Sequence, residues 1–336
     1  MSDKKYLDSL QVLRGLAALT IVLSHIPIAS VFGQALGNFG VAIFYTLSGF
    51  LTIYVAKPGA VKFLKKRVLR IVPLYWAITL VTYVIATVKP GLFGNTVAKP
   101  EYLVKSLFFI PYYNPNTFLV RPILEVGWTL TMEVIFYLIF ALAIRLNFKY
   151  RNVITLCGLL MFYFALGAMY DGYALVAYKY WVKYFAMGLC IAWAWPVCDK
   201  WLNEHVKNIQ LPTFVAVVAE VVIILVACRI FGQHDQVYTY IWGLLPLMIL
   251  IIMAIFLLFN YVSKASKTLM LLGDISFELY LTHEYIVKGT QRLIMPLDVP
   301  GVKTAVVAVF CVIAALICSY FVHKIYDKIV TKFLTF

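Results

Sequence analysis

The sequence predicts an all-α integral membrane protein with about ten transmembrane helices and both termini in the cytoplasm. The 336 residues are 63% hydrophobic and only 13% charged, whereas a soluble domain carries roughly twice that share of charged residues. Apolar runs of about 20 residues, long enough to cross a bilayer, follow one another along the whole chain. Most of the 29 lysines and arginines fall on alternate connections between these runs, which is the positive-inside pattern.

The predicted spans are defined by their apolar runs alone. They are Leu7–Ser30, Leu36–Ala56, Leu69–Val88, Gly127–Ile144, Val153–Met169, Tyr180–Val197, Leu211–Phe231, Tyr240–Tyr261, Leu269–Lys288 and Val302–His323. An even number of crossings places both termini on one side, and the more basic connections select the cytoplasm for that side. The whole chain, residues 1–336, is expected to form a single transmembrane domain.

Two connections are unusual. Lys57–Arg70 is basic and amphipathic, which is typical of an interfacial helix on anionic lipid. Lys89–Val126 is long and contains several prolines and aromatic residues, so it is too long for a tight turn and is a candidate lid or acceptor surface.

The net charge of +14 does not indicate nucleic acid, because the basic residues flank apolar runs. They are expected to contact membrane lipids and phosphate groups. The six cysteines lie in or beside apolar segments without metal-like spacing, so we expect packing roles for them and no metal site. His205, His234 and His323 lie at loops or helix ends and are interpreted as solvated, while Glu220 and Asp274 have no assigned role.

The first predicted span contains two ionisable residues, Arg14 and His25. Such groups are costly at membrane depth and commonly mark function. Eleven positions separate them, so they share one helix face, with a rise of roughly 16 Å between them. Arg14 alone is explained by snorkelling to the headgroups, but the pair favours a functional polar track.

Five stretches along the chain form an ordered set of motifs. They are LQVLRGLAALTIVLSH, FGVAIFYTLSGFL, FLKKRVLRIVPLYW, VGWTLTMEVIFYLIF and LGDISFELYLTHEYI. Taken together they resemble the membrane acyltransferase 3 family, and most closely its exopolysaccharide O-acetyltransferase branch. Tyr45 replaces a more usual phenylalanine, and Val134 stands where many members have a second acidic residue.

The resemblance implies a bacterial inner-membrane enzyme that uses acetyl-CoA as acyl donor. The acceptor it implies is a sugar hydroxyl of a surface polysaccharide or of its lipid-linked precursor. Many members fuse an extracytoplasmic hydrolase-like domain to this core, and none is expected within this chain. Proteins of polysaccharide assembly are a further candidate partner.

Acyl transfer to a hydroxyl needs a base for the hydroxyl proton. His25 is the candidate base, because the unperturbed pKa of an imidazole lies near working pH. Glu133 and His283 are expected at a similar depth, where Glu133 would orient the imidazole as in hydrolase triads. We assign catalysis to His25, Glu133 and Arg14, although Glu133 could equally serve as a structural ion-pair partner.

The donor is anionic, and guanidinium groups bind phosphate in bidentate fashion. Arg67 and Arg70 lie three positions apart at the inner surface, so they are expected to bind the nucleotide end of acetyl-CoA. Arg14, Ser48 and Tyr75 complete the predicted donor site. Close packing is the alternative explanation for Ser48, an interface-belt or packing role is the alternative for Tyr75, and lipid contact is the alternative for the basic residues.

The predicted acceptor site comprises His283, Trp128, Tyr137 and Tyr280, and packing is the alternative role for its three aromatic residues. At the level of function, two other classes remain open. One is a transporter of a sugar or lipid-linked glycan, since buried ionisable residues suit ion-coupled transport. The other is a non-catalytic membrane component of a polysaccharide assembly complex.

Overall fold

The computed structural model describes residues 7–26, 35–90, 92, 94, 96–169, 174–206, 209–232, 244–294 and 302–334. Across these residues the secondary structure is helical, apart from one isolated bridge between Tyr113 and Val120. The chain divides into two compact units, each described here by itself. The first unit is Met1–Val55 with Met187–His323, and the second is Ala56–Ala186 with Lys324–Phe336.

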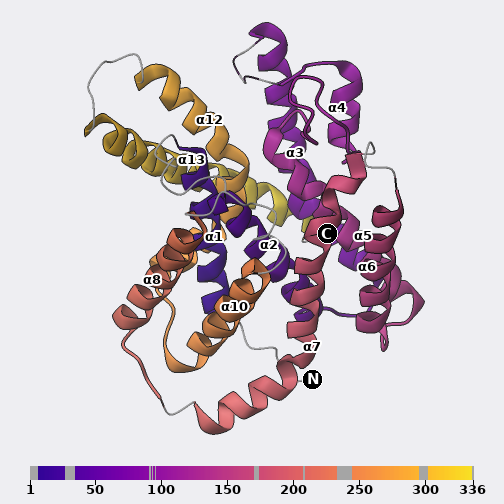
Figure 1. The fold of residues 1–336 in the computed structure, drawn as a ribbon, viewed down its shortest axis with the longest axis vertical. Coiled ribbons are helices and arrows are strands. Elements are labelled where there is room, and N and C mark those ends of the chain that lie inside the picture. The colour runs from indigo at the N-terminus through magenta and orange to yellow at the C-terminus, as the bar shows by residue number, and fades with distance from the viewer. Residues whose placement is uncertain are drawn as a thin grey trace. The chain divides into compact units, whose positions relative to one another are not determined.

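The first unit is built around α1 (Asp8–His25). This helix packs on α2 (Ala35–Tyr54), α8 (Thr213–Gly232), α10 (Leu244–Val262), α11 (Lys267–Asp274) and α12 (Ser276–Ile294) (Figure 1). The larger part of α7 (Val182–His205) and of α13 (Val302–Leu334) also belongs to this unit. Most of α1 is buried, so its polar side chains are held by protein on several sides.

Glycines allow the helices of the first unit to approach closely. A Cβ built on Gly40 of α2 would lie 2.7 Å from the carbonyl oxygen of Ala17 on α1, and one on Gly188 of α7 would lie 2.0 Å from the carbonyl oxygen of Thr46. A Cβ on Gly15 would meet Gly273 of α11 at 2.7 Å. Small residues at helix contacts therefore set these distances, which is the usual reason for glycine in membrane helices.

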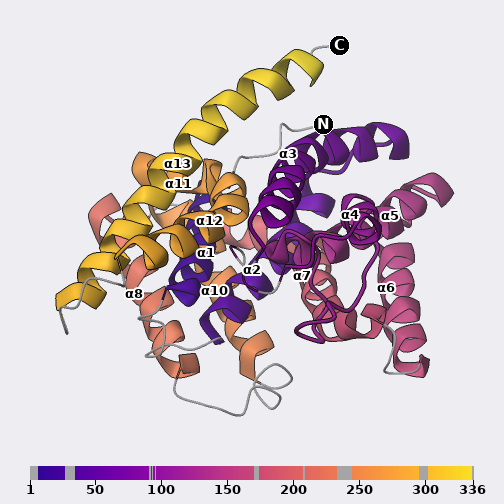
Figure 2. The same cartoon turned by 90° about the horizontal axis from the view of Figure 1, so that it is seen from above.

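Helices α12 and α13 lie next to each other (Figure 2), and polar contacts pair them in antiparallel order. Nδ1 of His323 lies 3.0 Å from a carboxylate oxygen of Glu278, and the hydroxyls of Thr282 and Ser319 lie 3.2 Å apart. Thr290 hydrogen-bonds with Cys311 further along. Residue numbers rise on α12 as they fall on α13, so one stripe of α12 faces one stripe of α13. The expectation that His323 is a solvated headgroup residue is wrong, because it pairs with a buried carboxylate.

The second unit contains α3 (Ala60–Val88), α4 (Pro100–Leu107), α5 (Trp128–Leu146) and α6 (Arg151–Ala168). Two short 3₁₀ helices, Glu125–Gly127 and Ala174–Trp181, complete its described helices. Helix α5 packs on α3 and α6, and α4 packs on α3. The predicted connection Lys57–Arg70 is not a separate interfacial helix: from Ala60 onward it forms the first turns of α3. Gly59 precedes it with φ 109°, a left-handed conformation that favours glycine.

The long connection before α5 is folded rather than extended. It contains α4, and Ser106 of α4 hydrogen-bonds through both its hydroxyl and its carbonyl. The Ser106 hydroxyl lies 3.1 Å from the Tyr112 hydroxyl and accepts a hydrogen bond from the Ile123 amide at 3.0 Å. Burial raises the pKa of Tyr112 to about 12, so its hydroxyl stays protonated and continues to hydrogen-bond.

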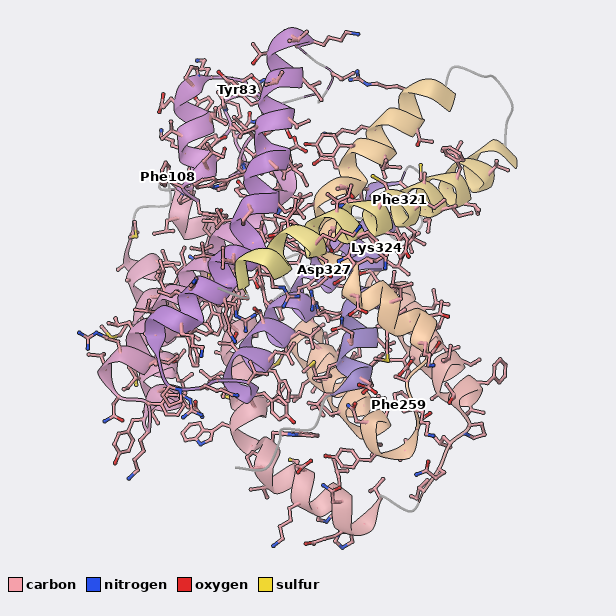
Figure 3. The ribbon with its side chains drawn as sticks, turned by 180° about the vertical axis from the view of Figure 1, so that it is seen from behind. Tyr83, Phe108, Phe259, Phe321, Lys324 and Asp327 are labelled. Carbon is pink, nitrogen blue, oxygen red and sulfur yellow. The ribbon has the colours of Figure 1, made fainter. Side chains whose placement is uncertain are left out.

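Within the described residues, seven helices are long and apolar enough to cross a membrane. They are Leu36–Tyr54, Ala60–Val88, Glu125–Leu146, Arg151–Ala168, Tyr178–His205, Leu244–Val262 and Val306–Ile329. Large apolar side chains on them are exposed, among them Phe321 on α13 at 60% (Figure 3), as expected for contact with lipid. The chain is therefore a multi-pass membrane protein, and the predicted all-α class is confirmed for the described residues.

Three predicted spans are not among these seven. Leu7–Ser30 corresponds to α1, whose apolar run is interrupted by Arg14 and other polar residues, and its residues 27–30 lie outside the described part. Leu211–Phe231 corresponds to a shorter apolar helix, Thr213–Val226. Leu269–Lys288 is not continuous, because the helix breaks at Ile275 between α11 and α12. The hydroxyl of Ser276 donates to the Gly273 carbonyl at this break, at 2.7 Å.

Candidate active site

Two imidazole rings meet in the first unit, where the end of α1 reaches α12. The ring centroids of His25 and His283 lie 4.7 Å apart with an interplanar angle of 72°. His283 has no exposed surface, whereas His25 is exposed. The sequence predicts a similar depth for these residues, and the structure places their rings in edge contact. One ring is thus accessible while the other supports it from within the protein.

The backbone determines which nitrogen of each ring carries a proton. Nδ1 of His25 lies 2.8 Å from the carbonyl oxygen of Ile21, and Nδ1 of His283 lies 2.8 Å from the carbonyl oxygen of Tyr280. A carbonyl oxygen only accepts, so each Nδ1 must donate. In the neutral rings Nε2 is then the basic nitrogen. Nε2 of His283 is buried without a hydrogen-bond partner among the described residues.

Ser24 is a neighbour of this pair that the sequence motif does not single out. Its hydroxyl lies 3.1 Å from Nδ1 of His25 and donates to the Ile21 carbonyl at 2.7 Å. Tyr280 lies on the other side, with its ring 6.0 Å from His283 and 6.2 Å from Phe44. In the sequence, only the position of Ser24 directly before His25 indicates a role for this serine.

Arg14 and Ser48 are the other predicted site residues of the first unit. Both are half-buried. Arg14 shares the continuous helix α1 with His25, so the rise of roughly 16 Å between them expected for an unbroken helix is retained. Ser48 lies on α2, which packs directly on α1.

In the second unit, three predicted residues form a chain of contacts. The guanidinium of Arg67 lies over two rings, 4.9 Å from the centroid of Tyr137 and 5.5 Å from that of Phe63. The Tyr137 hydroxyl donates to the carboxylate of Glu133 one turn away. Arg67 and Glu133 are thereby linked through one tyrosine, which holds the guanidinium plane in a fixed orientation.

Arg70 differs from Arg67 although both lie on α3. Arg70 is exposed and Arg67 is half-buried. The Tyr326 hydroxyl lies 2.8 Å from the Leu69 carbonyl and 2.9 Å from that of Arg70, so it binds the backbone here. The predicted arginine pair therefore consists of one stacked guanidinium and one that projects from the helix.

Tyr75 and Trp128 have different surroundings. Tyr75 is 1% exposed, donates its hydroxyl to the Ser106 carbonyl at 3.0 Å and stacks on Phe109. It attaches the long connection to α3, in agreement with a packing role. Trp128 is half-buried, and the guanidinium of Arg121 lies 5.4 Å from its ring. The ring centroid of Trp181 lies 5.3 Å from that of Trp128. Trp128 therefore packs between a second tryptophan and the guanidinium of Arg121.

The predicted meeting of Glu133 with His25 and His283 remains a prediction. The histidines belong to the first unit and Glu133 to the second. Among the other residues noted in the sequence, Asp274 accepts a hydrogen bond from Gln11 of α1 at 2.6 Å. His205 is exposed and stacks on Trp201, and His234 lies outside the described residues.

Comparisons with known proteins identify the family of the chain. A family model described as an acyltransferase domain matches residues 7–324. The exopolysaccharide production protein ExoZ of Rhizobium meliloti is 27% identical over 290 residues, which cover 81% of this chain and 84% of that protein.

Two further relatives match over a smaller share of their own length. The acyltransferase MdmB of Streptomyces mycarofaciens is 31% identical over 42% of this chain and 40% of its own length. The O-acetyltransferase OatA of Staphylococcus aureus is 25% identical over 85% of this chain, which spans only 51% of OatA. No solved structure matches the chain. From the extent of the family match, the chain belongs to the membrane acyltransferase 3 family.

Proposed function

We propose that this chain is a membrane O-acetyltransferase. It moves an acetyl group from cytoplasmic acetyl-CoA to a sugar hydroxyl of a surface polysaccharide or of its lipid-linked precursor. The observation that carries the proposal is the contact between His25 and His283, in which the backbone holds the proton on Nδ1 of each ring. The similarity to ExoZ, an exopolysaccharide production protein, and to OatA, an O-acetyltransferase, supports a polysaccharide acceptor and an acetyl group.

His25 acts as the general base. Its Nε2 takes the proton of the attacking hydroxyl while the oxygen forms a bond to the acetyl carbonyl carbon. The carbon–sulfur bond then breaks, and the CoA thiolate leaves with the electron pair of that bond. The proton on His25 can pass to the thiolate, so the enzyme returns to its starting state and no other reactant is needed.

His283 stabilises the charged form of His25. When His25 has taken the proton, its new N–H stays directed at the reacting groups, and the lone pair of the unprotonated Nε2 of His283, which has no hydrogen-bond partner among the described residues, stabilises the positive ring that it contacts. In hydrolase triads a carboxylate performs this task. Glu133 remains the candidate for an additional carboxylate, and its bond to Tyr137 would keep it oriented.

Arg67 and Arg70 bind the phosphates of the donor at the cytoplasmic surface. The stacking of Arg67 on Tyr137 and Phe63 supports this, because a preoriented guanidinium loses less entropy on binding phosphate. Arg14 is assigned to the acyl-bearing arm of the donor. The proposed topology has ten crossings of a bacterial inner membrane, with both termini in the cytoplasm. In this topology the donor and the acceptor reach α1 from opposite ends.

The decisive test uses the full chain purified in detergent with acetyl-labelled acetyl-CoA. An O-acetyltransferase hydrolyses the thioester slowly or labels a sugar acceptor, and His25→Ala loses both activities while inserting into the membrane normally. A transporter or an assembly component would leave the thioester intact. In cells, NMR of surface polysaccharide with and without the gene should show the loss of one acetyl group.

A further inference from the structure

The last turns of α13 contact α3 within the second unit, at the segment that carries Arg67 and Arg70. The hydroxyl of Tyr326 lies 2.8 Å from the carbonyl oxygen of Leu69 and 2.9 Å from that of Arg70. A carbonyl oxygen only accepts, so the hydroxyl donates. A side chain of α13 therefore hydrogen-bonds to the backbone of α3 beside the two arginines.

Pro73 explains why the backbone of a helix accepts this hydrogen bond. It lies inside α3, and proline has no amide hydrogen. In an unbroken α-helix the amide of residue 73 would donate to the carbonyl of Leu69, four positions earlier. The carbonyl of Arg70 is served by the amide of Leu74 in the same pattern. A phenol has a single proton to donate, and Leu69 is the residue whose carbonyl lacks its helical donor.

The surroundings of α3 make this replacement important. The helix is long and apolar enough to cross a membrane, where a carbonyl without its helical donor cannot rely on water. Proline is tolerated in such helices when a neighbouring helix supplies the missing partner, and here α13 supplies it. Proline is also the commonest site of a helix kink, so a contact beside it influences the direction of the helix segment that precedes it.

After the proline, α3 is attached to α4. The hydroxyl of Tyr75 donates to the Ser106 carbonyl at 3.0 Å, and Nε1 of Trp76 donates to the Leu107 carbonyl at 2.8 Å. These two residues directly follow the proline in space and in sequence. The second half of α3 therefore has its own hydrogen-bonded support.

Before the proline, α3 is held by ring contacts and by Tyr326. The ring of Phe63 lies 5.8 Å from that of Tyr137 and 5.1 Å from that of Phe140, both on α5. The guanidinium of Arg67 lies over the same tyrosine ring. Of these contacts the hydrogen bond from Tyr326 is the most directional, so it fixes where the first half of α3 lies relative to the end of α13.

We propose that Tyr326 is a positioning residue for the acyl donor. Its hydroxyl replaces the amide that Pro73 lacks and holds the first half of α3 in the orientation in which Arg67 and Arg70 bind the nucleotide phosphates. The proposal rests on the proposed role of these arginines in donor binding. Tyr326 acts through the backbone of α3 and is assigned no contact with the donor.

Tyr326→Phe keeps the ring and removes only the hydroxyl. It is expected to raise the KM for acetyl-CoA roughly 3- to 10-fold, as for the loss of one hydrogen bond, with kcat nearly unchanged. The KM for S-acetylpantetheine, a thioester without the nucleotide phosphates, should stay at the wild-type value. Tyr150→Phe, at an exposed tyrosine before α6, is the matched control. An unchanged KM for acetyl-CoA, or an equal rise for both donors, overturns the proposal.

Pro73→Ala tests the role of the missing amide. Alanine supplies an amide hydrogen for the Leu69 carbonyl, so Tyr326→Phe should cost much less in this background than in the wild-type chain. Amide hydrogen exchange of residues 62–72 of α3, measured without donor in the wild type, both single variants and the double variant, should be faster only in Tyr326→Phe. Equal losses in both backgrounds, or exchange that Tyr326→Phe does not change, would show that the hydroxyl has another role.

A variant with both Arg67→Ala and Arg70→Ala separates this proposal from the proposed donor site. Weakened binding of acetyl-CoA is expected in that variant. If it binds acetyl-CoA like the wild type, the donor site is wrongly assigned and the positioning role falls with it. If its binding is weakened while Tyr326→Phe keeps the wild-type KM, the donor site stands and only the role of Tyr326 is wrong.

Discussion

His25 obtains its orientation from its own helix. The carbonyl of Ile21, one turn earlier, holds Nδ1, and the Ser24 hydroxyl packs beside it. His283 is fixed in the same manner by the carbonyls of Leu279 and Tyr280. At this scale the chemistry of the site is local, because each imidazole is oriented by the backbone one turn before it.

His283→Gln is expected to lower kcat roughly 10- to 100-fold with little change in the KM for acetyl-CoA. The reason is the loss of the imidazole that stabilises the charged form of His25, since polar interactions with a charged group contribute about 1.5–3 kcal/mol. Steady-state kinetics on the purified protein provide the measurement. His205→Gln, at an exposed histidine of α7, is the matched control, and a His283 variant with wild-type kcat would remove this residue from the mechanism.

Arg67→Lys is expected to raise the KM for acetyl-CoA about tenfold while leaving kcat nearly unchanged. Lysine keeps the charge but loses the planar guanidinium that stacks on Tyr137 and binds phosphate bidentately. Arg145→Lys, at an exposed position near the end of α5, should leave KM unaltered. If Arg67→Lys also leaves KM unaltered, Arg67 is a lipid or packing residue.

At the scale of helices, close contacts decide how the first unit is built. Gly40 lies against α1 so tightly that a Cβ would meet the Thr20 hydroxyl at 2.5 Å and the Ala17 carbonyl at 2.7 Å. The helix pair α12 and α13 is fixed by polar contacts instead, from Glu278 and His323 to Thr282 and Ser319. The close glycine contact and the polar contacts both fix the rotation of the helices that carry His25 and His283.

Gly40→Ala should destabilise the protein by about 1–3 kcal/mol, the usual cost of overpacking. The neighbouring carbonyl belongs to the backbone of α1 and cannot move alone, so α1 and α2 must separate. The unfolding midpoint in detergent measures this effect. Gly167→Ala on α6, where a Cβ meets nothing within 4 Å, should be neutral or slightly stabilising, and equal midpoints for both variants would contradict the packing argument.

At the scale of the whole molecule, the amphiphilic pattern of the chain predicts its course through the membrane. Seven described helices satisfy the length and composition of a span. The three other predicted crossings, at α1, α8 and the α11–α12 pair, do not satisfy these criteria and stay predictions. The proposed topology places the connection before α5 outside and the connection between α5 and α6 inside.

Single cysteines introduced into a chain whose own cysteines are replaced by alanine test that topology. Asn116→Cys should react with a membrane-impermeant maleimide on intact cells with a permeable outer envelope, and Asn147→Cys only after the inner membrane is opened. Both positions are exposed, so they form a matched pair. The reverse pattern of labelling would invert the proposed orientation and move the donor site to the wrong side.

The sequence by itself determined the membrane class, the helical composition and the family, because mean hydropathy and motif order are properties of the chain read along its length. It also indicated the single-face placement of Arg14 and His25, which depends only on the geometry of one unbroken helix. The break at Ile275, the start of α3 at Ala60 and the pairing of His323 with Glu278 were not predicted. The pairing depends on contact between two helices, whereas the break and the start of α3 coincide with local backbone features, the Ser276–Gly273 hydrogen bond and the left-handed Gly59, that mean hydropathy does not report.

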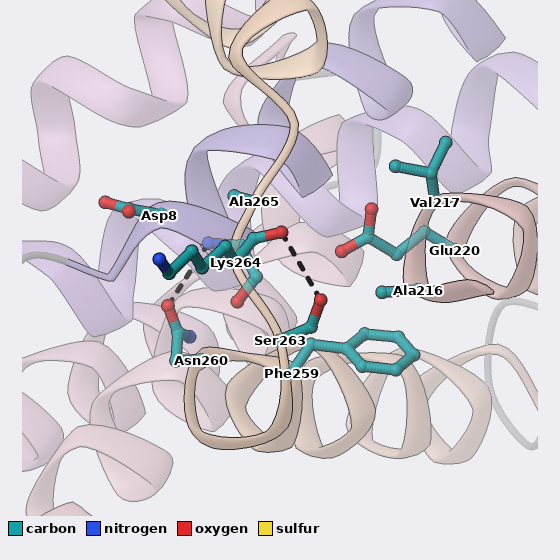
Figure 4. Close-up of a pocket in the computed structure, with 10 residues that line it drawn as sticks. Asp8, Ala216, Val217, Glu220, Phe259, Asn260, Ser263, Lys264 and Ala265 are labelled. Carbon is teal, nitrogen blue, oxygen red and sulfur yellow. Dashed lines mark hydrogen bonds between the residues drawn. The ribbon is translucent and has the colours of Figure 1, made fainter. Parts of the chain in front are cut away.

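The tertiary structure alone decided which polar residues have partners. From the sequence, Asp274 and Glu220 are both acidic residues in apolar segments without an assigned role. In the structure Asp274 accepts a hydrogen bond from Gln11 of α1, whereas Glu220 lines a cavity (Figure 4). Likewise only packing brings His283 against His25. The physical reason is that hydropathy measures the cost of burying a group, whereas the compensation for that cost comes from whatever neighbour the fold supplies.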